Sequence, residues 1–317
     1  MKIKRKISFL LAFLLTVTLI SPVLTEDSYA AEVTASGSCG TNATYQLYSD
    51  GTLYISGSGA MADYAAANSS PFYNIRSSIK KVVIKSGITR IGNQAFALCA
   101  SNDTGAAITS VEMADTVTSV GDFAFYCQSK LSSVKFSKNL KSIGYVAFMQ
   151  CAFTSVDLPD SLTTIDGSAF SEAKLSSVTI PDSVTSMGHG AFWYCTSLKS
   201  AKISSGLTSL DFSQFYGCSS LEVMYIPDSV TSFETSYPGM SGTMFFGVSE
   251  DFYIWCYAGS YAASYAKKKN IPYVNPSLKD ASLSLSDTSF AYDGTAKTPV
   301  VTVTYDGNTL TEGTDYT

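Results

Sequence analysis

The sequence predicts a β-rich α/β fold, a solenoid of 22–23-residue units with parallel short strands and short helical turns, capped at both ends and followed by a partial β-sandwich. Three observations predict it. An Ala-Phe pair returns at a nearly fixed interval, five apolar columns keep register with each Phe, and the composition is 45% hydrophobic but only 15% charged. Such a chain can bury a substantial core and is not of the disordered class.

Residues 1–30 are predicted to form a secretory signal peptide. MKIKRK is basic, ISFLLAFLLTVTLISPV is apolar, and Ser28-Tyr29-Ala30 offers small residues at a cleavage site. A membrane anchor is the alternative, but the apolar run is short for a span. Removing the segment leaves 17 basic and 24 acidic residues, a net charge of −7. This balance argues against nucleic acid as a partner, and no later segment is long and apolar enough to span a bilayer.

Residues 31–78 are predicted to form an N-terminal β-rich cap. Short alternating runs flank Ser49-Asp50-Gly51, which is a hairpin signal. Because the first coil of a solenoid exposes its apolar interior, a segment in this position is expected to cover it.

Residues 79–248 repeat one pattern. After a first gap, the phenylalanines of the Ala-Phe pairs are spaced by 23, 22, 22 and 23 residues. These phenylalanines are Phe96, Phe125, Phe148, Phe170, Phe192 and finally Phe215, where Gln214 replaces the alanine. Each unit reads L-x-x-V-x-I, then a turn often spelled Pro-Asp-Ser, then V-x-x-I-G-x-x-A-F. The chain therefore contains six full copies and the start of a seventh at Leu221.

Each part of the unit predicts a local structure. The V-x-I alternation predicts a half-buried strand, and Pro159, Pro181 and Pro227 end it because proline cannot donate to a strand ladder. The G-x-x-A-F-x-x-C segment is too short for an independent helix and predicts a single helical or 3₁₀ turn. One unit cannot enclose its apolar side chains alone, whereas stacked units bury them against each other. A parallel solenoid is the expected result.

The C-terminal part is predicted to close the solenoid and then change character. Residues 249–275 form a terminal repeat or cap, in which 258–269 predict a short amphipathic helix with Lys267–Lys269 in its last turn. Residues 276–281 form a linker that starts at Pro276. In 282–317, strand-like runs alternate with Asp-Gly turns, and about 36 residues are too few for a sandwich of ≈ 100 residues. We expect a truncated domain there.

The residues most suggestive of catalysis fall into repeat columns. His189, the sole histidine, occupies a variable column that elsewhere holds Asn, Asp, Tyr, Gly or Phe. Cys195 occupies a column of Cys, Ala and Gln, which indicates a small buried hydrophobe, and we expect reduced thiols there. Catalytic, metal-binding and cofactor motifs are absent from the sequence, so no cofactor is expected and the chain is predicted not to be an enzyme. Whether any of the seven cysteines pair stays open at this point.

The units carry a family resemblance. L-x-S-V-x-I-P-D-S-V-T-S-I-G-x-x-A-F-x-x-C, over roughly residues 79–248, resembles the BspA-like class of bacterial leucine-rich repeats. The segment from Tyr257 to Val274 resembles the terminal unit of that family, and residues 290–317 resemble the start of a bacterial Ig-like domain. This resemblance implies an exported, often cell-surface protein that binds host or environmental macromolecules. It implies no particular ligand.

The outward positions of the predicted strand are expected to form one continuous sheet face, which is the candidate binding face. They combine small hydroxyls with mixed charges, which suits a polar contact with a protein or glycan and equally suits a solvated sheet. These positions are Ser110, Glu112, Ser133, Lys135, Ser155, Asp157, Ser177, Thr179, Ser200, Lys202 and Tyr225. A second candidate surface comprises the aromatic residues near the short turns, Tyr126, Trp193, Tyr194 and Tyr216.

The expected function is that of a secreted or cell-surface binding protein, adhesin-like, presenting its solenoid face to a protein or glycan. We expect an extracellular monomer. Attachment of this protein to the cell wall would require a region outside this sequence. A structural spacer or stalk for another surface domain is the alternative. An enzyme whose catalytic region follows residue 317 is the least favoured of the three.

Overall fold

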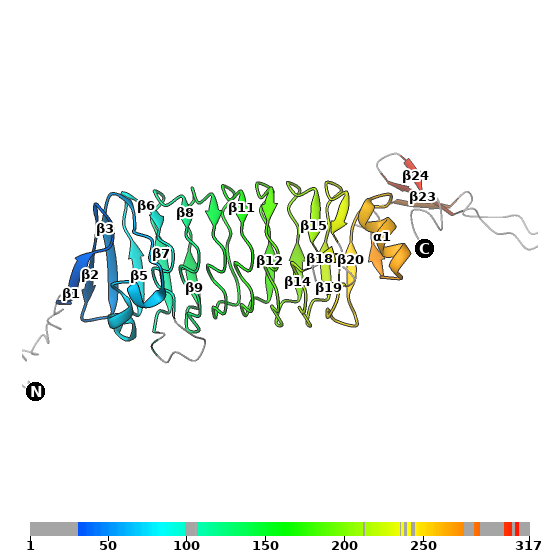
Figure 1. The fold of residues 1–317 in the computed structure, drawn as a ribbon. Helices are drawn as coiled ribbons and strands as arrows, with labels where there is room; N and C mark the ends of the chain where they lie inside the picture. Colours follow the sequence, from blue (N-terminus) through cyan, green and yellow to red (C-terminus); the bar gives the residue numbers. More distant parts are fainter. Residues whose placement is uncertain are drawn as a thin grey trace, which may run out of the picture.

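The protein is a rod of stacked coils (Figure 1), seen here in a computed structural model. The structure describes residues 31–98, 105, 107–211, 213–234, 236–237, 240–241, 245–275, 282–285, 301–305 and 308–310. The predicted signal peptide, the 276–281 linker, Cys99 and most of the predicted Ig-like segment lie outside the described residues. We number the coils 1 to 7 by their first buried residue: Ile79, Ile108, Leu131, Phe153, Leu175, Leu198 and Leu221.

The L-x-x-V-x-I segments form the first sheet along the rod, and the predicted parallel stacking is confirmed. Neighbouring strands keep the repeat register, with Val82 opposite Val111 and Val111 opposite Val134. The strands of its N-terminal half are β5 (Lys81–Ile84), β7 (Ser110–Met113) and β9 (Ser133–Lys135). Those of its C-terminal half are β12 (Ser177–Thr179), β14 (Ser200–Lys202), β16 (Val223–Tyr225), β20 (Tyr253–Trp255) and β21 (Tyr273–Val274).

A second parallel sheet, which the sequence did not predict, lies on another side of each coil. It follows the Pro-Asp-Ser turn and uses the V-x-x-I residues. Its strands are β4 (Gly59–Ala60), β6 (Ile88–Ile91), β8 (Ser119–Val120), β10 (Ser142–Ile143), β11 (Thr164–Ile165) and β13 (Ser186–Met187), then separately β15 (Ser209–Asp211) and β17 (Ser232–Glu234). Most of these strands have only two residues, so their hydrogen bonds to neighbouring coils define them.

The third side of each coil carries the phenylalanine column. The rings of Phe96, Phe125, Phe148, Phe170, Phe192 and Phe215 stack nearly parallel, with centroids 5.1–5.6 Å apart, and Phe72 extends the stack by one ring at 4.6 Å. Five of these coil rings are fully buried, and the other, Phe96, is 3% exposed. Burying one such side chain contributes about 1.5–3 kcal/mol, so the column stabilises the stack of coils.

The predicted helical turn on this side is a series of β-turns instead. The Tyr126 N–H donates to the Phe123 carbonyl at 3.2 Å, as a 3₁₀ turn requires. However, Phe123 and Cys127 have φ of 54° and 61°, which interrupts any helix. The N–H of Phe125 then donates to the Ala147 carbonyl of the next coil at 2.8 Å. The turns therefore join neighbouring coils as a ladder.

Each sheet is interrupted once. The first sheet lacks a strand in coil 4, where residues 155–157 belong to no strand. The second sheet is interrupted between β13 of coil 5 and β15 of coil 6. The expectation of one continuous sheet face is therefore wrong at coil 4.

The N-terminal segment continues the first sheet. Strands β1 (Val33–Ser38), β2 (Ala43–Tyr48) and β3 (Thr52–Gly57) are antiparallel, and β2 and β3 form the predicted hairpin around Asp50. β3 then pairs in parallel with β5, and Leu53 and Ile55 are fully buried against the solenoid. Two 3₁₀ helices, η1 (Ala67–Ser69) and η2 (Tyr73–Ser78), lead into coil 1.

The C-terminal end contains the predicted helix, α1 (Tyr261–Lys269). The Ser260 hydroxyl accepts from the Ala263 N–H at 3.1 Å, three lysines occupy the last turn, and Asn270 ends the helix with φ of 55°. Antiparallel pairs are also formed by β18 (Ser236–Tyr237) with β19 (Met240–Ser241), and by β22 (Ser282–Leu285), β23 (Val301–Tyr305) and β24 (Asn308–Leu310). Within the described residues, no helix has the length and apolar character of a membrane span.

Candidate functional site

The outward side of the first sheet presents most of the predicted binding residues. They alternate with buried Val111, Val178, Ala201 and Met224, because successive side chains of a strand point to opposite faces. We call the following set the first-sheet face: Ser110 and Glu112 on β7, Ser133 and Lys135 on β9, Ser177 and Thr179 on β12, Ser200 and Lys202 on β14, and Tyr225 on β16. All nine are exposed or half-exposed.

Ser155 and Asp157 do not join this arrangement. Both side chains are exposed, but they lie in the coil 4 segment that belongs to no strand. Bulky rings account for the interruption. Phe136 and Phe153 stand in columns that other coils fill with aliphatic residues, and each contacts Phe148 edge-on, at 5.6 and 6.0 Å. The larger side chains separate the two coils at this side.

The first-sheet face has its own local contacts. Lys81 Nζ lies 2.7 Å from Glu112 Oε1, and this hydrogen bond holds the pKa of Glu112 below its usual value. Lys202 Nζ lies 5.8 Å from the Tyr225 ring centroid. Sequence reasoning missed Lys81 and also Trp255, which contacts Tyr225 edge-on at 6.1 Å. The sequence pattern did not identify Trp255, because the copy after coil 7 is out of register with the repeat.

The second candidate surface is an aromatic row on the turn side. The Tyr194 side chain is exposed, its ring lies 5.8 Å from Tyr216, and Tyr216 stacks on Phe246 at 5.1 Å. Trp193 contacts Tyr194 edge-on at 5.2 Å. Tyr126 is separate from this row and is half-buried. Phe246 was missed because it lies where the seventh copy breaks register.

The cysteine column is buried and has a specific role. The thiols of Cys151, Cys195 and Cys218 donate to the carbonyls of Phe125, Phe170 and Phe192 in the preceding coil, at 3.4, 3.1 and 3.2 Å. The Gln128 side-chain amide makes the same bond to Phe96 at 2.6 Å. The column therefore supplies a donor to a buried carbonyl, which a purely hydrophobic interpretation overlooked. Burial raises the pKa of Cys218 to about 12, so it is a poor nucleophile.

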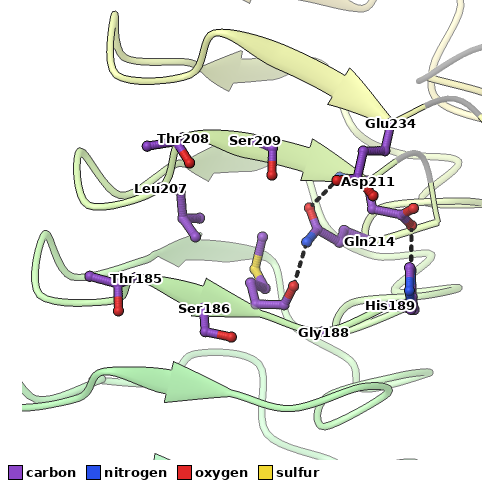
Figure 2. A pocket seen from close by; sticks show the side chains of 11 residues that line it. Thr185, Ser186, Gly188, His189, Leu207, Thr208, Ser209, Asp211, Gln214 and Glu234 are labelled. Atoms are coloured by element: carbon purple, nitrogen blue, oxygen red, sulfur yellow. Dashed lines mark hydrogen bonds and ion pairs between the residues drawn. The ribbon is translucent and has the colours of Figure 1, made fainter.

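A polar cleft of about 240 Å³ opens between coils 5 and 6, where the second sheet is interrupted (Figure 2). In the regular coils, the N–H at the glycine position donates directly to the preceding coil, as Gly188 does to Ile165 at 2.8 Å. In coil 6, the Gln214 side chain stands between the two groups. Its Oε1 accepts from Asp211 N–H at 3.1 Å, and its Nε2 donates to the Met187 carbonyl at 2.8 Å. One buried amide thus spaces the two coils apart.

His189 lies at one end of this cleft with Asp211 (Figure 2). Its Nδ1 is 3.2 Å from Asp211 Oδ1, and the histidine side chain is 60% exposed while the aspartate side chain is 6% exposed. The same Oδ1 accepts from the N–H of Ser213 at 2.8 Å and from its hydroxyl. The carboxylate oxygen is therefore engaged in holding the turn. Among the described residues, no three His, Cys, Asp or Glu side chains are placed to hold a metal ion.

Column counting placed His189 in a variable turn and did not reveal this pair. The available signal was the coincidence of two substitutions in coil 6, Asp211 for glycine and Gln214 for alanine. A polar side chain at a core column indicates that a neighbouring backbone group has lost its usual partner.

A solenoid of short parallel strands, with an apolar column per coil and a polar outer sheet face, defines the class of leucine-rich repeat proteins. The model of the BspA type leucine rich repeat region matches residues 65–151 and 118–237, in six copies. The chain therefore belongs to the BspA-type leucine-rich repeat family. Proteins of this kind are repeat-based protein-interaction modules, generally without enzymatic activity, and BspA-type repeats are surface-associated.

Several solved structures contain a similar chain. A leucine-rich repeat protein from Eubacterium ventriosum is 23% identical, with 71% of this chain and 73% of that chain covered and a TM-score of 0.48. One from Bacteroides ovatus is also 23% identical, with 68% and 54% covered and a TM-score of 0.47. A leucine rich cell surface protein from Faecalibacterium prausnitzii is 21% identical, with 64% and 73% covered and a TM-score of 0.34. No protein with a curated description matches the chain.

Proposed function

We propose that this chain is a secreted or cell-surface binding protein, adhesin-like, which presents the first-sheet face to a protein or glycan of its surroundings. The observation that carries the proposal is the alternation along the first sheet. Buried Val111, Val178 and Met224 fix the strands, while the outward side chains of the same strands are exposed or half-exposed. The hydrogen-bonded strands and their small hydroxyls lose little conformational entropy on binding.

A binding screen with matched charge variants tests the proposal. The purified protein is immobilised and exposed to extracellular matrix proteins and a glycan array. A bound ligand is then tested against Lys135→Glu and Lys202→Glu, which lie on the first-sheet face. Lys141→Glu is the control, because Lys141 is exposed next to β10 on the second sheet. We expect roughly tenfold weaker binding for the face variants alone, corresponding to about 1.4 kcal/mol. Equal affinity of all variants contradicts the proposal.

The elongated shape favours a second candidate, a spacer that holds another domain away from the cell (Figure 1). β1 and α1 lie at opposite ends of the stacked coils, so the rod separates what is attached to them. This function predicts that Lys135→Glu and Lys202→Glu leave cell attachment unchanged, whereas deleting a whole number of coils changes the reach of the attached domain.

A further inference from the structure

The interruption of the first sheet creates a groove between coils 3 and 4. The groove has a volume of about 580 Å³. Its apolar residues are Val134 and Phe136 of coil 3 and Leu158 and Pro159 of coil 4. Val134 and Val156 are only half-buried, although the same column is buried at Val111 and Val178. The core is therefore partly accessible from the first-sheet face at this point.

The backbone beside the groove lacks its usual partners. In regular coils, the N–H at the end of the strand donates to the next coil, as in Ile180 to Lys202 at 2.9 Å and Ile203 to Tyr225 at 3.0 Å. Phe136 holds the equivalent position in coil 3, and its N–H makes no hydrogen bond to any described residue. Residues 155–158 likewise make no backbone hydrogen bond to either neighbouring coil within the described chain.

The turn beside the groove also lacks a side-chain connection between the two coils. Asp115 and Asp182 each accept the backbone N–H of the corresponding turn in the next coil, from Lys138 and Ser205, both at 3.0 Å. In coil 3 this turn position is Lys138, which has no acceptor to offer to Asp160 N–H. The side-chain connection that joins coils 2 and 3 and coils 5 and 6 is thus absent beside the groove.

Opposite charges line the two walls. Lys135 and Lys138 belong to coil 3, and Asp157 and Asp160 to coil 4. None of the four forms an ion pair within the described residues. Lysine commonly protects a sheet edge from pairing with another chain. Here the basic wall of coil 3 faces the acidic wall of coil 4, so a strand with one acidic and one basic side chain complements both.

We propose that this groove binds an extended peptide segment of a protein partner by strand addition beside β9. A peptide carbonyl accepts from the Phe136 N–H, an apolar side chain packs on Phe136 and Leu158, and flanking acidic and basic side chains face Lys135 and Asp157 respectively. A neutral glycan satisfies the N–H but offers no charge to the two lysines and two aspartates of the groove, so the observations favour a peptide. The inference rests on the proposed function, because the groove lies on the first-sheet face.

The test uses two capped synthetic pentapeptides, Val-Glu-Val-Lys-Val and the neutral Val-Gln-Val-Gln-Val, added to the full secreted chain labelled with ¹⁵N at phenylalanine. At millimolar peptide, we expect the charged peptide to shift the Phe136 amide resonance and to bind roughly tenfold more tightly than the neutral one. Lys135→Glu is expected to abolish this difference, while Lys141→Glu leaves it intact. A Phe136 resonance that does not move with either peptide overturns the proposal.

A second variant distinguishes this inference from the proposed function. Lys138→Asn restores a side-chain acceptor for Asp160 N–H and is expected to narrow the groove and weaken the charged peptide at least tenfold. If a partner found by screening binds the Lys138→Asn chain unchanged, but loses affinity with Lys202→Glu, the strand-addition inference fails while the proposed function stands. Loss of partner binding with Lys138→Asn, in a chain with unchanged thermal stability, supports the inference.

Discussion

The buried thiols act as hydrogen-bond donors within the stack of coils. Each of Cys151, Cys195 and Cys218 is a second donor to a phenylalanine carbonyl that also accepts a backbone N–H of its own turn. A hydrogen bond contributes about 0.5–1.5 kcal/mol net, so this weak donor adds a small stabilisation to that of its apolar surface. Ala173 shows that one coil tolerates the absence of a donor in this column.

The thiols are predicted to be unreactive in the folded protein. Burial raises the pKa of Cys195 and raises that of Cys218 to about 12, so thiolate does not form between pH 7 and 9, where an ordinary thiol of pKa about 8.5 titrates. A thiol reagent in that range should react with none of the six described cysteines in a Cys99→Ser variant. All six should react after unfolding without reductant. If one or none of the six thiols reacts after unfolding, the cysteines form disulfides.

The Pro-Asp-Ser turn predicts a pH dependence. Hydrogen bonds from the backbone N–H and the side chain of Ser205 hold the pKa of Asp182 below its usual value. The ionised form is therefore favoured by folding, and its contribution is present above the unfolded pKa of about 3.9 and is lost as the pH falls through the folded pKa. Asp182→Ala should unfold at lower denaturant concentration at pH 7, and the difference from the unaltered chain should shrink toward pH 2.

Asp160→Ala is the matched control, since Asp160 holds the same turn position without accepting a hydrogen bond from the next coil in the described structure. It should change the denaturation midpoint less than Asp182→Ala at pH 7. Equal effects of both substitutions, or a difference that does not depend on pH, would show that the Asp182 carboxylate does not connect the coils.

At the scale of the element, the second sheet depends on hydrogen bonds that span about twenty residues of sequence. The V-x-x-I segment has no period-two alternation, and its strands are mostly two residues long, so local pattern could not reveal it. The first sheet was predictable because V-x-I alternates. The missing first-sheet strand in coil 4 was not predictable, because it follows from the way that the large Phe136 and Phe153 rings pack in the stacked coils.

The amide of Gln214 gives a prediction for the interrupted second sheet. Gln214→Leu keeps a side chain of similar size but leaves the Asp211 N–H and the Met187 carbonyl without partners, which should cost about 1–3 kcal/mol of unfolding free energy. Gln214→Ala restores the residue that other coils use and lets the two groups bond directly, so its loss should be smaller. Chemical denaturation measures both values. A greater loss for Gln214→Ala would argue against the spacing role of the amide.

At the scale of the whole molecule, the rod should show an uneven pattern of amide hydrogen exchange. Amides that bridge coils, such as those of Ile180, Ile203 and Ile226, should exchange slowly because opening them separates packed coils. The amides of Phe136 and Leu158 make no such bond and should exchange faster by orders of magnitude. Exchange followed by NMR tests this, and uniform protection of all five would contradict the interruption at coil 4.

The repeat itself made the overall architecture predictable, because six copies of Ala-Phe or its variant set the coil length and the buried columns. The helix near the C-terminus was predictable from its lysines, although it begins at Tyr261 rather than at 258. The pairing of His189 with Asp211 could not be predicted, since 22 residues of sequence separate them and only the stacking of coils brings them together. The contacts that the sequence could not predict lie where a coil departs from the repeat pattern.

The two interruptions occur at different levels of the rod and on different sides. Where coils 3 and 4 separate at the first sheet, β10 and β11 remain paired at the second. Where coils 5 and 6 separate at the second sheet, β12 and β14 remain paired at the first. At each interruption, one of the two parallel sheets therefore still joins the neighbouring coils by backbone hydrogen bonds. A force applied along the rod must break such bonds at either interruption before the coils separate.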